Sequence, residues 1–511
     1  MSGRSSLLSP RARRRRKGAA VAILPGAALL GLIGLLGRDD TARAQSASSG
    51  SLLTMVDTLT SDGVYQFNAL DQQAAIANDT AYESLLPLCG TTTPVGSATS
   101  APPTSPSCSG PTLNLFDHLR ELEDNANELL HDTGETQYSL HLNPVGMASA
   151  LQWTAPEEFA AQGSLTTRFA NSQAGLLSDR FAALRFATQQ IQLADGGTWQ
   201  PTDDSGALGG SAGADSNEAS FGRWSVYVNG GFGSGSKNPT VFEDAFYFDD
   251  TQASAGMDVR LSDVLVVGVM AGHVEQRVDF NSSESIVAGG VRGNGQSGLL
   301  YAQLDWGSAY LDLAAGLQHM TLDSRRRITY PSNNALIPSV DDTSYSNTGA
   351  TSWIGTLGTG YTFTYRGFSA NPYLNVQFVN VHINAFTEYD GSGFDIDTPS
   401  QSIQSLEADP GLKLEYVLLN RFGVLIPYAY GEYRHEFRDG SRDIASSYAA
   451  GTGGVDFNLP TDASPRHYYL AGGGASVVLK HGVQGFVQYV QVLDYQNYSD
   501  HVISGGIRLE F

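Results

Sequence analysis

The feature that most limits the fold of this chain is a two-residue alternation of apolar and polar side chains, which begins near Arg223 and continues to the end. In "AYLDLAAGLQ", for example, Leu311, Leu313 and Leu317 share one side. Asp312 lies on the other. This period belongs to β-strands with one apolar and one polar face. About twelve such segments follow one another, so an all-β C-terminal part is predicted.

The connections between these segments separate a membrane barrel from a soluble β-sandwich, since both contain alternating strands. Short turns are expected at 262–263, 307–308, 366–367, 420–421 and 481–482, and long polar loops near 233–248, 280–296, 324–350, 389–401 and 438–465. Alternation of short and long connections is typical of outer-membrane barrels. In lipid the sheet must close, because every backbone polar group needs an internal partner. Residues 221–511 are therefore predicted to form a transmembrane barrel of about 12 antiparallel strands.

The N-terminus has the layout of a secretory signal peptide. A basic block that begins at Arg11 is followed by the apolar run "AAVAILPGAALLGLIGLLG" and by the small-residue pattern "ARA", which ends at Ala44. We expect cleavage between Ala44 and Gln45, which removes residues 1–44. The alternative is a membrane anchor, which Pro25 disfavours.

The charge of the chain excludes one class of function. Its formal net charge is −22, and residues 1–44 contain nine basic and two acidic side chains, so the exported chain carries about −29. A chain this acidic repels nucleic acid, and nucleic-acid binding is excluded. The 57 glycines and 23 tyrosines suit closely packed strands better than helices.

Residues 45–153 are predicted to form a small α-helical domain. Two apolar stripes with helical spacing cover 67–85 and 115–129. The loop between them, "CGTTTPVGSATSAPPTSPSC", is bounded by the only two cysteines, Cys89 and Cys108. In an oxidising compartment we expect one disulfide, which would join the facing ends of a helical hairpin; two unpaired thiols are the alternative.

Residues 154–220 are predicted to contain a linker helix and then a Gly/Ser-rich linker. The segment "TAPEEF" has capping-box spacing from Thr154 to Glu157, and the helical pattern extends to about Leu193. The linker 196–220, when extended, is also long enough to cross the ~25 Å apolar band of a membrane barrel. The sequence therefore leaves open whether the helix or the linker fills the lumen.

Complementary charges are a physical reason to place the helix in the lumen. Six residues are candidates to line it: Arg168, Arg180 and Arg185 on the helix, and Asp258, Asp305 and Asp312 on the strands. Ion pairs in a confined pore are less screened than those on a surface. A solvated helix outside the membrane is the alternative.

The chain ends in "HVISGGIRLEF", a strand whose apolar face includes Ile507, Leu509 and Phe511. An aromatic residue at the end of such a strand suits the membrane interface. The periodicity itself shows only that this face is compatible with lipid.

The C-terminal part of the chain resembles the β-barrel translocator domain of autotransporters, the proteins of type V secretion. The resemblance covers about residues 220–511 and rests on "ASAGMDVRLSDVLVVGVMAG", "NPYLNVQFVNVHINAFTEYDG", "IPYAYGEYRHEF" and "GGIRLEF", together with the strand count. It implies that the barrel helps to export the N-terminal segment, with a helix or linker in the pore. It also implies that the barrel-assembly machinery reads Phe511, Leu509 and Ile507 as a signal.

The resemblance further implies a location in the outer membrane of a Gram-negative bacterium, with the N-terminal domain exposed at the cell surface. The partners that it implies are the lipid of this membrane, periplasmic chaperones and the barrel-assembly machinery. Many passengers of this family are long β-helices, whereas residues 45–153 are short and helical. Adhesin or protease functions therefore do not follow from the resemblance.

No sequence motif predicts an enzyme, a cofactor or a metal site. "GGSAG" (209–213) matches G-x-S-x-G but lies inside the linker. "GNGQSG" (293–298) matches G-x-G-x-x-G, but we expect a loop followed by a strand, not a helix. His435 and Glu436 fall on opposite strand faces without a second histidine at ligand spacing. Asn171 is a candidate self-cleavage point without a supporting motif.

Three functions are consistent with these features. The first is an outer-membrane autotransporter-like protein whose barrel supports export and surface display of its own N-terminal segment. The second is an outer-membrane channel with a periplasmic plug or partner-binding N-terminal domain. The third is a surface-anchored hydrolase, for which His118, His131 and His141 are the available histidines.

Overall fold

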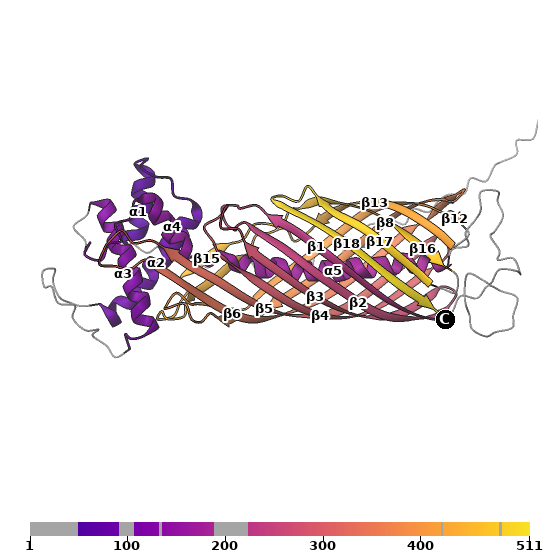
Figure 1. Cartoon of the computed structure of the whole chain (residues 1–511), viewed down its shortest axis with the longest axis horizontal. Coiled ribbons are helices and arrows are strands. Elements are labelled where there is room, and N and C mark those ends of the chain that lie inside the picture. The colour runs from indigo at the N-terminus through magenta and orange to yellow at the C-terminus, as the bar shows by residue number, and fades with distance from the viewer. Residues whose placement is uncertain (1–49, 91–106, 132–134, 189–222, 421–422, 480–482) are drawn as a thin grey trace, which may run out of the picture. The chain divides into compact units, whose positions relative to one another are not determined.

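The computed structural model describes residues 50–90, 107–131, 135–188, 223–420, 423–479 and 483–511. Within these residues the N-terminal part is helical and the C-terminal part is β-structure (Figure 1). The helices are α1 (Ser51–Ser61), α2 (Ala69–Cys89), α3 (Pro111–Leu130), α4 (Pro144–Thr154) and α5 (Ala160–Thr188), with a 3-10 turn, η2 (Glu157–Phe159), before α5.

Twelve long antiparallel strands form a closed barrel. They are β1 (Trp224–Lys237), β2 (Phe246–Ser262), β3 (Leu265–Phe280), β4 (Gly289–Asp305), β5 (Ala309–Tyr330), β6 (Val340–Tyr361), β8 (Phe368–Ile383), β11 (Gln401–Tyr416), β13 (Gly423–Glu436), β16 (His467–Leu479), β17 (Val483–Leu493) and β18 (Tyr498–Glu510). The short strands β7 (Phe363–Tyr365) and β12 (Leu418–Asn420) pair with β8 and β13. The predicted barrel of about 12 strands is confirmed.

Closure depends on the pairing of the first and last strands. β1 and β18 pair continuously from Ser225 opposite Glu510 to Lys237 opposite Tyr498. The pairing of β8 with β11 joins the remaining neighbours. No edge is left along these strands, which is the condition for a sheet in lipid.

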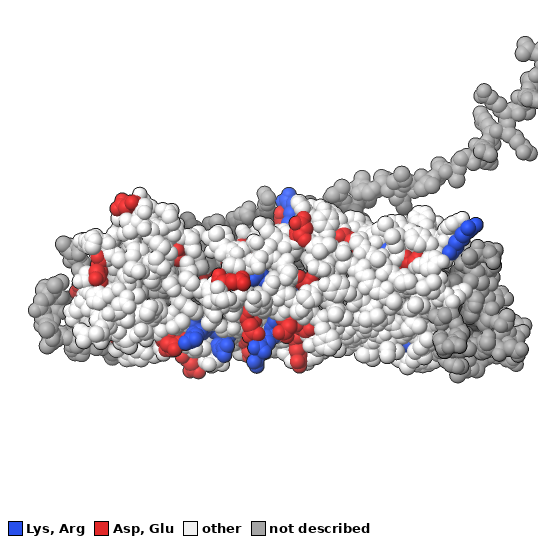
Figure 2. Space-filling view, turned by 45° about the horizontal axis from the view of Figure 1, so that its top comes forward, with Lys and Arg blue, Asp and Glu red and all other residues white. Residues whose placement is uncertain are grey.

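The barrel wall has one polar and one apolar side. On β5, for example, Leu317 is 46% exposed whereas Gln318, which points into the lumen, is 2% exposed. Figure 2 shows few charged side chains on the part of the wall that lies farther from the helices. The charged side chains gather on the part nearer to the helices. Among the described residues, no helix is long and apolar enough to span a membrane.

The strands are longer than the hydropathy alternation indicates. A loop was expected over 324–350, but β5 continues to Tyr330 and β6 starts at Val340, and the two pair throughout. The expectation of a loop at 293–298 is also wrong, because these residues lie within β4. The apolar pattern stops where the wall leaves lipid, whereas backbone pairing continues beyond it.

Helices α1 to α4 pack against extensions of the barrel strands. A second sheet contains β9 (Phe386–Thr387), β10 (Ile396–Thr398), β14 (Asp443–Tyr448) and β15 (Phe457–Pro460). One buried apolar cluster contains residues of both parts, including Leu52, Leu85 and Leu119 from the helices and Phe394 and Phe457 from the barrel side. The helices and the strand extensions therefore share one core.

Local sequence explains where these helices begin. Asn68 caps α2 by accepting from the Asp71 N–H, and the Asp71 carboxylate accepts from the Asn68 N–H. The helix expected to start at Thr154 starts instead at Ala160. Thr154 is the last residue of α4, where its hydroxyl donates to the Leu151 carbonyl, 2.7 Å away, and is not available as a cap.

Candidate functional site

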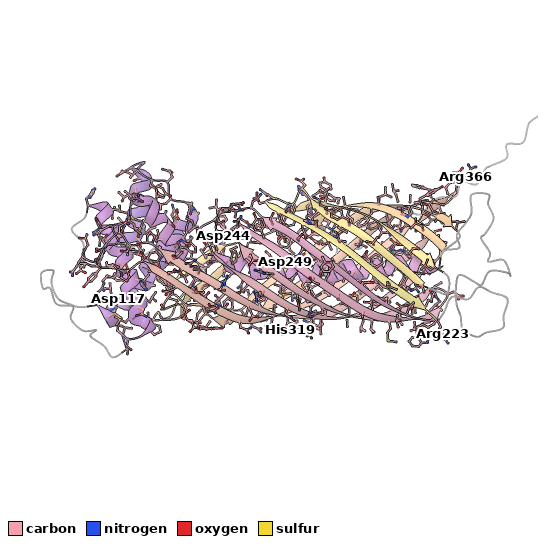
Figure 3. The ribbon with its side chains drawn as sticks, in the orientation of Figure 1. Asp117, Arg223, Asp244, Asp249, His319 and Arg366 are labelled. Atoms are coloured by element: carbon pink, nitrogen blue, oxygen red, sulfur yellow. A yellow bond between two sulfur atoms is a disulfide. The ribbon has the colours of Figure 1, made fainter. Side chains whose placement is uncertain are left out.

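Helix α5 lies inside the barrel, where it contacts β2 to β6 and β8 (Figure 1). At one end, Gln162 donates to Ser324 on the distal part of β5, at 3.0 Å. At the other end, Arg185 contacts Asp312, close to the short turn that precedes β5. The helix therefore runs from the end of the barrel with long connections to the end with short turns, which Arg223 and Arg366 mark in Figure 3.

Arg168 binds two aspartates from different strands. Its Nε donates to Asp250 Oδ1 on β2 at 2.8 Å, and its Nη1 contacts the Asp500 carboxylate on β18. The guanidinium also lies over the Phe248 ring, 4.4 Å from the centroid. Because β18, β1 and β2 are consecutive in the wall, this arginine bridges the strands that close the barrel.

Arg180 is buried in a polar cluster of the lumen. Its Nε donates to Asp258 Oδ2 at 2.8 Å, and its Nη2 donates to Ser225 Oγ at 2.7 Å. Asp258 also accepts from the Tyr301 hydroxyl at 2.8 Å. The Tyr227 ring covers the guanidinium at 4.6 Å. Each charge in this cluster therefore has a partner, as buried charges require.

Arg185 repeats this arrangement on β5. Its Nη1 lies 2.6 Å from Asp312 Oδ2, and its guanidinium lies 4.0 Å from the Tyr310 ring centroid. Gln303 donates to the other Asp312 oxygen at 2.8 Å. All three arginines of α5 thus combine a carboxylate with an aromatic ring.

Only some of the lumen residues predicted from the sequence contact one another in the structure. The structure brings Arg180 to Asp258 and Arg185 to Asp312. Arg168 contacts Asp250 and Asp500 instead, which the sequence analysis missed. Asp305 is buried near a short turn and accepts from the Gly307 N–H at 2.7 Å. The sequence did indicate that Asp250 faces the lumen, because it is an even number of residues from Asp258 on the same strand. The alternation does not show, however, how far along the barrel axis a residue lies.

Two glycines of the wall make room for α5. A side chain on Gly295 would begin 2.7 Å from the Phe169 ring. A side chain on Gly272 would overlap the Gln173 amide. A helix fits in this lumen because the wall lacks side chains where it passes, which gives the high glycine content a physical meaning.

Open space also borders α5 in the lumen. A cavity of about 570 Å³ lies between the helix and wall strands that include β8, β11, β13, β16 and β17. Its lining includes Ser164, Asn171 and Asp179 from the helix and Tyr430 and Glu432 from the wall. Asn171 accepts from Gln377 at 2.6 Å; self-cleavage at this residue stays a prediction.

The helical part is fixed to the strand extensions by buried polar contacts. The Tyr448 hydroxyl of β14 donates to Asn78 Oδ1 of α2 at 2.7 Å, and Asn78 Nδ2 donates to the Thr154 hydroxyl at 2.9 Å. The ring of His118 stacks on Phe394 at 5.0 Å. These contacts join α2, α3, α4 and the second sheet.

A cluster of buried charged side chains lies at the junction between α4 and α5. Arg326 on β5 contacts Glu388 at 2.7 Å, and both side chains are buried. Glu157 and Glu158 of η2 are buried nearby. Burial raises the pKa of Glu157 and of Glu158 well above the usual range of a glutamate.

The other predicted residues fall in three places. Cys89 and Cys108 form a disulfide. Phe511, Leu509 and Ile507 are exposed on the outer wall of the last strand. The Ala44–Gln45 bond, the linker 196–220 and the segment 209–213 lie outside the described residues, so signal-peptide cleavage stays a prediction.

The histidines of the helical part do not form a hydrolytic arrangement with Ser139. His141 Nδ1 lies 2.8 Å from Glu128 Oε2, and Ser139 donates its hydroxyl to the same carboxylate rather than to the imidazole. A nucleophilic serine must donate to its base. His131 ends α3 in a left-handed conformation. No metal-binding group of three His, Cys, Asp or Glu side chains occurs in the described part of the chain.

Comparison with known proteins identifies the barrel. The model of the autotransporter β-domain matches residues 226–490, which is more than half of the chain. The chain belongs to the autotransporter β-domain family. Members of this family are outer-membrane barrels of Gram-negative bacteria, and the resemblance stated from the sequence is confirmed.

Several solved autotransporter structures are similar to this chain. The translocator domain of NalP from Neisseria meningitidis is 15% identical, and the match covers 68% of this chain and 99% of that one, with a TM-score of 0.44. The β-domain of the Bordetella autotransporter BrkA is 14% identical, with coverages of 57% and 100% and a TM-score of 0.41. The transport unit of AIDA-I from Escherichia coli is 13% identical, with coverages of 56% and 89% and a TM-score of 0.37. No curated protein matches the sequence.

Proposed function

We propose that this autotransporter carries its own helical N-terminal part to the cell surface and keeps it there as a cap on the barrel. In this proposal residues 45–153 are the passenger, α5 is the segment that stays in the lumen, and the short-turn end of the barrel faces the periplasm. Family membership supports the role of the barrel. The contacts of α5 and of helices α1 to α4 support the remaining steps.

The observation that carries the proposal is the position of α5 between the helical part and β1. The chain leaves α4 at Thr154 beside the strand extensions and then runs through the lumen, where Arg185 reaches Asp312 near the short turns. β1 begins at Trp224, which pairs with Phe511 at that same end. The N-terminal helices and the start of β1 are therefore at opposite ends of the lumen, as expected for a segment that was carried through it.

Retention of the cap is supported by the shared core. The apolar cluster joins α1 to α4 with β9, β10, β14 and β15, and Asn78 and Tyr448 form a hydrogen bond inside it. A passenger destined for release would not be expected to bury its own apolar surface against the barrel. We therefore propose surface display without release.

Assembly is part of the same proposal. We propose that periplasmic chaperones deliver the chain and that the barrel-assembly machinery recognises its last strand through Phe511, Leu509 and Ile507. The three side chains are exposed on the outer wall, where another protein can reach them before insertion.

Protease treatment of intact cells tests the location of the cap. Surface display predicts that residues 45–153 are cut in intact cells while the barrel strands are kept, and mass mapping identifies the lost peptides. Permeabilised cells are the control, since they show that the protease can cut the helical part when it reaches it. Protection in intact cells with cutting after permeabilisation would place the helices in the periplasm and would favour the plugged-channel alternative.

A further inference from the structure

Six of the ten histidines in the sequence lie on the outer wall of the barrel, each on a different strand. This group, named the histidine belt, consists of His273 (β3), His319 (β5), His382 (β8), His435 (β13), His467 (β16) and His501 (β18). Five of them are exposed and His435 is half-buried. Figure 3 shows His319 at the outer edge of the barrel.

Along each of these strands, starting from the short-turn end of the barrel, the outward side chains are first mainly apolar. The belt histidine comes after them. On β5 the outward residues Leu313 and Leu317 come directly before His319. On β18 the outward residues Leu509, Ile507 and Ile503 come before His501 in the same direction. The belt therefore lies where the lipid-compatible wall ends, on the side of the long connections.

Half of the belt forms a continuous row across five neighbouring strands. His273 pairs with Gln296, Gln296 with His319, His319 with Thr351, and Thr351 with His382. A histidine thus stands on every second strand, with an uncharged polar residue between each pair. This spacing leaves room for one headgroup between successive imidazoles, since neighbouring strands lie ~4.8 Å apart.

A second part of the belt is an aromatic cluster on β13 and β16. His435 and His467 are directly opposite each other, with ring centroids 6.5 Å apart. Tyr433 stacks on both, and Tyr469 lies beside it at 5.7 Å. Tyrosine and histidine both present an apolar ring and a polar tip, which suits the border between lipid and water.

The belt has few carboxylate neighbours although the chain is strongly acidic. Glu275 lies 3.7 Å from His273. His319, His382 and His501 contact the hydroxyl groups of Thr351, Ser402 and Ser234. Arg434 and Glu436 flank His435 in the chain, but Arg434 donates to Glu432 and Glu436 accepts from Ser405. Asp439, near His435, pairs with Arg466 at 2.7 Å. Among the described residues, most belt imidazoles therefore have no carboxylate within ion-pair distance.

We propose that the histidine belt binds phosphate-bearing headgroups of the outer leaflet. A neutral imidazole donates one N–H to a phosphate oxygen, and a protonated one donates two and adds a positive charge. The belt lies at the level where such headgroups meet the wall, and among the described residues His273 is the belt histidine that lies within 4 Å of a carboxylate. This proposal rests on the membrane placement of the barrel and does not depend on export of the helical part.

The expected selectivity is for anionic over zwitterionic lipid, because a headgroup whose phosphate charge is not offset accepts a stronger hydrogen bond from an imidazole N–H. The carboxylate contact at His273 weakens the effect at that strand.

Tryptophan quenching by brominated lipid tests the proposal on the whole mature chain in phosphatidylcholine vesicles. Trp353 is an outward residue of β6, 60% exposed and two positions from Thr351 in the histidine row. Brominated phosphatidic acid should quench its fluorescence more strongly than brominated phosphatidylcholine, because the belt imidazoles hold the anionic headgroup beside it. The signal lost in Trp353→Phe is the signal of this site.

Two pairs of variants make the result decisive. His319→Gln with His382→Gln should abolish the preference, whereas His118→Gln with His141→Gln in the helical part should leave it unchanged. His319→Tyr with His382→Tyr keeps an aromatic border but removes the imidazoles, and the preference should again be lost. Circular dichroism verifies that each variant is folded.

The proposal is overturned if both lipids quench equally, or if the preference survives the glutamine pair. It is also overturned if the tyrosine pair keeps the full preference, because the belt is then an ordinary aromatic border. None of these results changes the expected protease pattern on intact cells, so failure here is distinguishable from failure of the proposed function.

Discussion

Arg180 of the lumen helix and Asp258 of β2 form an ion pair in which both side chains are buried. Ser225 and Tyr301 add hydrogen bonds to the two partners, and Tyr227 covers the guanidinium. Together with the pairs of Arg168 and Arg185, this contact fixes one face of α5 to β18, β2 and β5. The helix is thus held by charge although a cavity borders it, with Arg168 and Arg185 in the lining of that cavity.

Replacement of Arg180 by methionine should destabilise the barrel strongly. The change leaves the buried Asp258 carboxylate without the arginine that pairs with it, and breaking a buried pair in this way costs about 3–5 kcal/mol. The free energy of unfolding in urea measures this loss. Arg180→Met combined with Asp258→Asn should recover part of it, because the unpaired charge is then absent.

The matched control for Arg180 is Arg327→Met on β5. Arg327 pairs with Asp341 at 2.8 Å, but both side chains are exposed on the outer surface. Exposed pairs contribute at most about 1 kcal/mol. An equal loss in the two arginine variants would contradict the role given to burial.

Replacement of Gly295 by valine should displace α5 from the lumen. The new side chain would overlap the Phe169 ring, which starts 2.7 Å from the Cβ position. Trypsin cleavage after Arg180 reports this displacement, because the arginine is buried when the helix is in place. Gly298→Val on the same strand is the control, since a Cβ there has no neighbour within 4 Å. Cleavage that is the same in both variants would rule out the close fit.

Much of the barrel follows from the sequence because its determinants are local. The alternation around Leu311 and Leu317 gives the face of each residue, and closure follows from the lack of water in lipid. The pairing of Arg168 with Asp500 could not be obtained in this way. It depends on the tilt of the strands and on the rotation of α5, which bring together residues far apart in the chain.

The helical part illustrates a second limit of sequence reasoning. The stripes over 67–85 and 115–129 correspond to α2 and α3, but Leu52 and Met147 belong to two further helices that the pattern did not reveal. α1 and α4 are each 11 residues long and obtain their burial from neighbours in the shared core. Helices this short are specified by tertiary packing more than by their own periodicity.

Replacement of Tyr448 by phenylalanine should loosen the cap without affecting the barrel. The change removes the hydrogen bond to Asn78 and leaves a buried amide oxygen unpaired, at a cost of about 1–3 kcal/mol. Limited proteolysis of the folded chain should then cut residues of α1 to α4 faster while the strands stay intact. Tyr489→Phe on the outer wall is the control, and an identical cutting rate in the two variants would contradict the docking role.

The stability of the helical part should fall as the pH rises. Glu123 of α3 accepts from the Ser51 N–H at 3.2 Å and lies beside Asp79, which accepts from the Leu52 and Leu53 N–H groups. Burial, with Asp79 as a second cause, raises the pKa of Glu123 from 4.5 to about 10. The folded state therefore holds this proton more tightly than the unfolded state does.

The direction of this pH effect follows from proton linkage. The contribution of Glu123 to stability is full below its unfolded pKa of 4.5 and is lost progressively up to about pH 10. One group gives a slope of at most about 1.4 kcal/mol per pH unit. Urea unfolding followed by the fluorescence of Trp153 in α4 measures it. Glu123→Gln should flatten the slope, whereas the exposed Asp57→Asn should not, and an unchanged slope in Glu123→Gln would falsify the assignment.

Phe511 offers a test of the assembly signal that separates recognition from stability. Its N–H and carbonyl pair with Trp224, at 2.9 Å and 3.1 Å, and these backbone bonds persist in Phe511→Ala. Phe363 on β7 is a matched control, since both rings are 58% exposed on the outer wall. Loss of either ring removes a similar lipid contact and should change the refolding stability of the purified chain by a similar, small amount.

The two variants should differ in the cell. If the barrel-assembly machinery reads the terminal aromatic residue, Phe511→Ala reduces the amount of folded barrel in the outer membrane severalfold, whereas Phe363→Ala does not. Quantification of the folded chain in membrane fractions measures the difference. Equal amounts of the two variants would remove the special role of Phe511 and would leave its ring as one more lipid contact of the closing strand.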